Sequence, residues 1–182
     1  ERQPMLTDRE IISTLEMLEN ENLDVRTVTL GINLLDCAGS SLDRVRDKIY
    51  SKIAHLAQNL VPVCDRIGQK YGIPVVNQRI AVSPIAVVAA ALSSSQQVEI
   101  SKALNAVAQE VNVDFIGGFS ALVQKGVARG DRALIEAIPH ALAATERVCA
   151  SVNVATTRAG INMDAVLLMG QIIKKAAGLT AD

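Results

Sequence analysis

Two kinds of apolar pattern alternate along this chain. Runs of β-branched and aliphatic residues at 24–35, 74–82, 114–119 and 147–155 each predict a strand. Between them, apolar residues recur at helical spacing, most clearly at Leu42, Val45, Ile49 and Ile53. A strand, a helix and a second strand in succession pair in parallel through a right-handed crossover. We therefore expect an α/β fold in which parallel strands alternate with helices and are apolar enough to be covered on both faces.

The helical segments have recognisable boundaries. Thr7 and Glu10 have the spacing of a capping box, which predicts a first helix to about residue 20. Further helices are expected from residue 41 onward with a kink or restart at Pro62, and at 83–92, 97–111, 131–145 and 162–177. A length of 182 residues lies within the usual range for one domain. We expect residues 1–182 to form a single α/β domain.

Charge and composition exclude several classes of partner. Eighteen basic and nineteen acidic residues give a net charge of −1, which provides no basic surface for nucleic acid or for an anionic membrane. The longest apolar run, residues 80–92, is too short to span a bilayer. Three widely spaced cysteines are typical of a reducing compartment. We predict a cytoplasmic protein that binds neither nucleic acid nor membrane.

Candidate site residues follow from the predicted strands. Ligands of parallel sheets gather at the carboxyl ends of the strands. Polar and glycine residues in or beside these segments are our candidates, namely Asp36, Cys37, Asp114, Gly117, Gly118, Ser120, Lys125, Asn153, Arg158 and Asn162. As catalytic residues we select Asp36, Cys37, Asp114 and Ser120, and as ligand-binding residues the other six. The sequence names no substrate and leaves open whether the chain is an enzyme.

Each of these candidates also has a purely structural interpretation. Ser120 lies in an incomplete nucleophile elbow, and the two glycines before it equally suit a tight approach of backbones. Cys37 follows a predicted strand, where a thiol would be reactive if exposed, but a packed thiol is the commoner case. Arg158 can hold an anion or pair on the surface, and Asn153 and Asn162 can bind a ligand or cap the chain. We expect Cys64 and Cys149 to lie in the core.

No metal or nucleotide motif is present. The two histidines, His55 and His140, are far apart and form no zinc-like ligand set. Neither a G-x-G-x-x-G nor a G-x-x-x-x-G-K-[ST] sequence occurs. We predict no metal site, and the cofactor, if there is one, is unknown.

Three segments carry a family resemblance: TLGINLLDC at 29–37, VDFIGGFSALVQKG at 113–126, and Val152-Asn153 with GINM at 160–163. Together they resemble the uncharacterised bacterial and archaeal group called "PFL family protein", of the UPF0210 type. The resemblance implies part of a pyruvate formate-lyase-like α/β barrel, and family members are considerably longer than this chain. The 182 residues would then be the amino-terminal portion of a barrel completed by a carboxyl-terminal partner segment.

The resemblance does not extend to radical chemistry. A glycyl radical enzyme needs a carboxyl-terminal glycine loop and a cysteine on a hairpin inside the barrel, and neither is recognisable here. We therefore expect a small-metabolite enzyme or binding protein with its pocket at the carboxyl ends of the strands. The alternative is a non-catalytic regulatory or assembly subunit that acts as a homo-oligomer.

Overall fold

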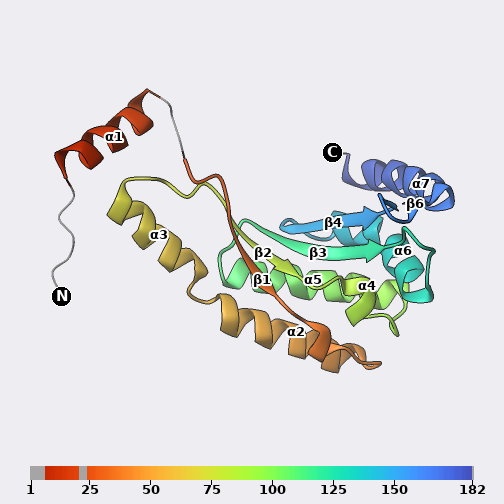
Figure 1. Ribbon diagram of the computed structural model, residues 1–182. Helices are drawn as coiled ribbons and strands as arrows, with labels where there is room; N and C mark the ends of the chain where they lie inside the picture. The colour runs from red at the N-terminus through yellow and green to blue at the C-terminus, as the bar shows by residue number, and fades with distance from the viewer. Residues whose placement is uncertain (1–6, 21–23, 182) are drawn as a thin grey trace.

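The computed structural model describes residues 7–20 and 24–181. Strands and helices alternate through most of this length (Figure 1). The elements are α1 (Asp8–Glu19), β1 (Val28–Ile32), the 3-10 turn η1 (Leu35–Cys37), α2 (Leu42–Ala57), α3 (Leu60–Tyr71), β2 (Gln78–Val82), α4 (Ile85–Val88), α5 (Ser94–Glu110), β3 (Phe115–Leu122), α6 (Arg129–Ala143), β4 (Val148–Asn153), β5 (Ala155–Thr156), β6 (Gly160–Ile161) and α7 (Met163–Thr180).

The four main strands form one parallel sheet in the order in which they occur in the chain, β1-β2-β3-β4. Val28 pairs with Gln78, Arg79 with Phe115, and Gly117 with Cys149. The predicted α/β class, with parallel strands that alternate with helices, is confirmed. Among the described residues the sheet is open, with β1 and β4 as its edges.

Helices α2, α4, α5 and α6 pack on one face of this sheet, where the core lies (Figure 1). Alternate strand residues point into this layer and are buried or half-buried, with Ile32, Ile80, Ile116 and Phe119 fully buried. Facing them are aliphatic side chains of the helices, among them Ile49, Ile53, Ile100, Leu104, Leu134 and Ile135. Burial of apolar surface on this face is the main force that fixes the register of the strands.

The other face of the sheet is uncovered within the part of the chain that the structure describes. Gly31, Ala81, Gly117 and Cys149 are register partners and form a row of small residues across all four strands. Beside this row is a groove of about 430 Å³, lined in part by Thr29, Arg79 and Phe115. The expectation that helices cover both faces was wrong for the described residues, and Cys149 is exposed rather than in the core.

Strand β3 runs to Leu122, three residues beyond its predicted end at Phe119, and contains a bulge at its paired glycines. A bulge shifts the register between Gly117 and Phe119, and Gly118 adopts a φ of 120°. A β-carbon on Gly118 would lie 2.6 Å from the carbonyl oxygen of Val82 on the neighbouring strand. Gly118 therefore permits the close approach of β2 and β3 inside the sheet.

Several element boundaries are also corrected. Strands β1, β2 and β4 are shorter than predicted, and the 83–92 segment holds only the four-residue helix α4. The helix after residue 41 breaks at Gln58 and Asn59, just before Pro62. The short hairpin of β5 and β6 was not predicted. None of the helices in the described ranges combines the length and hydropathy needed to span a bilayer.

Candidate functional site

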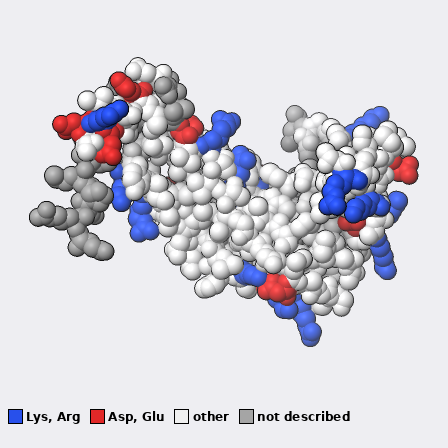
Figure 2. All heavy atoms as spheres, viewed as in Figure 1, with Lys and Arg blue, Asp and Glu red and all other residues white. Residues whose placement is uncertain are grey.

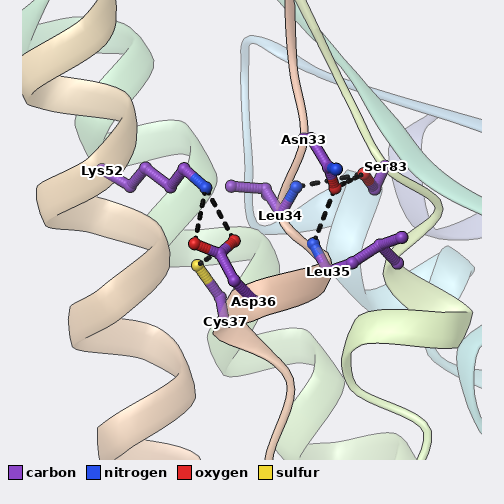
Figure 3. Close-up of polar contacts among 7 residues, drawn as sticks. All are labelled: Asn33, Leu34, Leu35, Asp36, Cys37, Lys52 and Ser83. Atoms are coloured by element: carbon purple, nitrogen blue, oxygen red, sulfur yellow. Dashed lines mark hydrogen bonds and ion pairs between the residues drawn. The ribbon is translucent and has the colours of Figure 1, made fainter.

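Polar residues at the carboxyl ends of the strands form two separate groups. The first group follows β1 and β2, on one side of the sheet, and is shown in Figure 3. The second follows β3 and β4, on the other side. The sequence-based prediction joined both groups in a single pocket. In the structure they lie along the same edge of the sheet but at its two ends, one beside β1 and β2 and the other beside β3 and β4.

In the first group, Asn33 and Ser83 tie the ends of β1 and β2 together (Figure 3). The Ser83 hydroxyl donates to Asn33 Oδ1 at 3.1 Å and accepts from the Leu34 amide at 3.0 Å. Asn33 Oδ1 also accepts from the Leu35 amide at 2.9 Å. Because these polar atoms are satisfied by one another, this network fixes the turn after β1 rather than offering free groups to a ligand.

Asp36 and Cys37 lie on the 3-10 turn that follows. Lys52 Nζ contacts the two Asp36 carboxylate oxygens at 2.6 and 2.8 Å, and this hydrogen-bonded contact lowers the pKa of Asp36 (Figure 3). Cys37 is buried, and burial, followed by the charge of Asp36, raises the pKa of its thiol. Cys37 thus lacks the exposure of a reactive thiol, and burial and Asp36 outweigh the effect of the nearby Lys52 on its pKa. Its catalytic role stays a prediction without structural support.

The second group surrounds a pocket of about 660 Å³ between the loop after β3 and the start of α7. Two cationic residues, Lys125 and Arg132, line it together with Asp164. Neither cation forms an ion pair with another residue that the structure describes. One carboxylate against two cations leaves this pocket with a formal charge of +1.

Asn162 holds this pocket in shape. Its Nδ2 atom donates to the Val123 carbonyl at 2.7 Å, and its Oδ1 atom accepts from the Ala165 amide at 3.2 Å as the N-cap of α7. The loop after β3 is thereby joined to the first turn of an 18-residue helix. The amides at the start of that helix have no acceptor within it and, with the helix dipole, favour a negative charge nearby.

A buried acceptor also lies in the pocket wall. The Gln124 side chain lines the pocket, and its Oε1 atom is buried and receives no hydrogen bond from the described residues. A buried polar atom without a partner is costly and calls for a donor. The pocket thus offers positive charge for an anion, and its wall contains a buried acceptor without a partner among the described residues.

The predicted site residues are only partly brought together. Lys125 and Asn162 line the second pocket, and Arg158 lies in the adjacent hairpin next to Ala159, which also lines it. Asn153 ends β4, where its carbonyl accepts from the Val123 amide at 2.9 Å. Gly117 and Ser120 lie within β3, and Ser120 is paired with Ser151, which is exposed on the uncovered face.

Asp114 lies at the opposite, amino end of the sheet. Its Oδ2 atom accepts from the Gln78 amide at 2.7 Å, and its own amide donates to the Gln78 carbonyl. The aspartate thus extends the pairing of β2 and β3 by one residue before the start of β3. We do not include it in the pocket.

Sequence reasoning missed Gln124, Arg132 and Asp164. Gln124 and Lys125 follow a long apolar strand, and this change to polar residues was an available signal. Arg132 and Asp164 lie in the first turns of helices, where charge is ordinary, so only the fold reveals that these two turns meet. No group of three or more His, Cys, Asp or Glu side chains within the described ranges is placed to hold a metal ion.

The sequence matches the family described as "Uncharacterised ACR (DUF711)" over residues 16–182. A "UPF0210 protein" of Syntrophobacter fumaroxidans is 63% identical over 178 residues, which cover 98% of this chain and 39% of the relative. The corresponding protein of Desulfovibrio desulfuricans is 60% identical, with the same coverage. "UPF0210 protein lmo0534" of Listeria monocytogenes is 55% identical over 95% of this chain and 38% of the relative.

These relatives are much longer than the chain. It spans about two fifths of their length and corresponds to their amino-terminal portion. The match nevertheless covers the whole sheet and both groups of polar residues. The chain belongs to the uncharacterised UPF0210 (DUF711) family, as the three sequence segments indicated.

Proposed function

We propose that this chain is part of a small-metabolite enzyme or binding protein whose pocket, at the carboxyl ends of β3 and β4, takes a small anion. The observation that carries the proposal is the pair of cations, Lys125 and Arg132, that face this pocket without an ion-pair partner among the described residues. The pocket lies where parallel sheets bind their ligands.

The chemistry of the pocket wall narrows the class of ligand. A phosphate or carboxylate suits Lys125, Arg132 and the first amides of α7. Rotation of the Gln124 side chain toward the pocket would let its Oε1 atom, which is buried and without a partner among the described residues, accept from a hydroxyl or amino group on the same molecule. Hydroxy acids, amino acids and sugar phosphates carry both groups. Asn162 acts as a positioning residue, because its hydrogen bonds hold the loop and the helix together.

We further propose that the four strands are one part of a larger barrel of the pyruvate formate-lyase type. Three features support this: the sequential strand order, helices on a single face, and small residues on the uncovered face. A parallel sheet is normally buried on both faces. The structure of a full-length relative tests the proposal, because a fifth strand is expected along the free edge of β4. Solvent or a helix along that edge would contradict it.

Binding is tested by thermal unfolding of the chain with inorganic phosphate, glycerol 3-phosphate, malate and serine. A ligand that binds only the folded state at 100 times its Kd stabilises it by about 2.7 kcal/mol. Lys125→Ala and Arg132→Ala should each raise the Kd by about 10- to 100-fold, because each loses a hydrogen bond to a charged group. The control is Lys48→Ala, which removes an exposed cation of α2 far from the pocket.

The outcomes separate the two functional classes. A ligand whose affinity falls in the pocket variants but not in Lys48→Ala supports the proposed pocket. Equal affinity in all three variants would mean that the ligand binds at another site. If no ligand binds a well-folded chain, the regulatory or assembly alternative is favoured.

A further inference from the structure

Helices α1 and α3 lie away from the pocket, and each exposes apolar side chains. Figure 1 shows α1 projecting beyond the end of α3, apart from the sheet and its covering helices. Its side chains Ile11, Ile12 and Leu15 are 45%, 57% and 51% exposed. Isolated helices of about 12 residues are marginal in water, and most of their stability comes from packing an apolar face. Helix α1 therefore requires a partner surface.

Helix α3 carries a matching stripe. Val63, Ile67 and Tyr71 follow one another at intervals of four residues, which places them on one face of the helix. They are 36%, 47% and 51% exposed. Cys64 lies beside this stripe and is buried, whereas the three residues of the stripe stay partly exposed and can receive another helix.

The charges beside the two stripes are opposite in sign. Asp8 and Glu16 border the apolar residues of α1, and Arg66 and Lys70 border those of α3. None of these four side chains forms an ion pair with another described residue. Figure 2 shows acidic side chains gathered at the end of the molecule where α1 lies, with Lys and Arg on the surface next to it.

We propose that α1 of one copy packs on the Val63–Ile67–Tyr71 stripe of a second copy, and that the chain forms a two-fold dimer by reciprocal exchange of this helix. A two-fold axis makes both contacts at once, so all four exposed stripes are covered. In the described arrangement α1 lies beyond its own α3, and exchange requires no change in the fold of either copy. Arg66 and Lys70 would then meet Asp8 and Glu16 across the interface, which fixes the orientation of the helices.

The oligomeric state of the full chain, measured by light scattering over a range of concentrations, tests the proposal. A dimer is expected for the unchanged protein. Leu15→Asp in α1 and Ile67→Asp in α3 should each weaken it by about 100-fold, because each places a charge in an apolar contact. Ser13→Asp and Gln69→Asp, on the opposite faces of the same helices, are the matched controls and should leave the dimer intact. A monomer at every concentration would overturn the proposal, as would equal effects of the test and control variants.

A crosslinking experiment separates exchange from packing within one chain. In a Cys149→Ser background, which removes the exposed cysteine, Ile12→Cys is placed in one copy and Ile67→Cys in another. Oxidation of the mixture should yield a disulfide between the two different copies. If the disulfide forms only within single chains that carry both substitutions, α1 packs on its own α3 and exchange is excluded. This result is independent of whether the pocket binds an anion.

Discussion

Replacing Gly118 by alanine should lower the free energy of unfolding by about 3–5 kcal/mol, through backbone strain and overpacking together. The φ of 120° at Gly118 is a conformation that residues with a side chain rarely adopt. The added methyl group would lie 2.6 Å from the Val82 carbonyl oxygen and would also overlap the Val82 side chain. Because strands β2 and β3 are both central, neither can move away without loss of sheet pairing. Urea unfolding followed by circular dichroism measures the effect.

The adjacent glycine provides the control for this prediction. A β-carbon on Gly117 would meet nothing closer than the Ile80 carbonyl oxygen at 3.9 Å, an ordinary contact, and Gly117 has no positive φ. Gly117→Ala should therefore change the free energy of unfolding by no more than about 1 kcal/mol, since alanine also reduces the entropy of the unfolded chain. Equal losses in both variants would mean that the bulge at Gly118 is not the source of the constraint.

Gly130→Ala should cost about 1–3 kcal/mol, because overpacking in a rigid contact outweighs the helix propensity gained with alanine. The new β-carbon would lie 2.8 Å from both the Ala86 carbonyl oxygen and the Ala90 α-carbon, which are backbone atoms. Helix α6 would have to move away from α4. Since α6 carries Arg132 into the pocket, the displacement should also weaken ligand binding there.

Gly170→Ala in α7 is the matched control, and we expect it to raise the free energy of unfolding rather than lower it. Nothing lies within 4 Å of a β-carbon at Gly170, so the variant should gain about 0.5–1 kcal/mol from helix propensity alone. Thermal unfolding compares the two, because 1 kcal/mol corresponds to about 2–4 °C in Tm for a chain of this size. A stabilising effect of Gly130→Ala would show that α4 and α6 can separate at little cost.

The sequence was sufficient for the fold class because strands and helices have different apolar periods. Ile80 and Ile116 lie in runs dense in aliphatic residues, whereas Val45, Ile49 and Ile53 recur at helical spacing. The sequence was not sufficient to predict which faces of the sheet are covered. Cys149 lies in an apolar run that suggests burial on both sides, and whether a second layer covers it depends on contacts outside this run.

The candidate site was predicted in part, because polar residues at the ends of apolar segments can be recognised from the sequence. Asn162 and Lys125 could be recognised because each is a polar residue at the edge of an apolar segment. Asp114 has the same local pattern but precedes its strand, and this places it at the amino end of the sheet. The strand predicted at 114–119 contains both glycines, but its continuation to Leu122 was not predicted. Only the proximity of Val82 on the neighbouring strand shows why residue 118 has to be glycine.

The sequential strand order has a consequence for how the chain folds during synthesis. Val28 pairs with Gln78, Arg79 with Phe115, and Ile116 with Val148, so each strand adds to the one made immediately before it. Domains generally fold as the chain emerges from the ribosome. In this sheet no strand has to wait for a distant partner or insert between two earlier ones. Among the described strands β4 is the last to join the sheet, and it keeps one free edge.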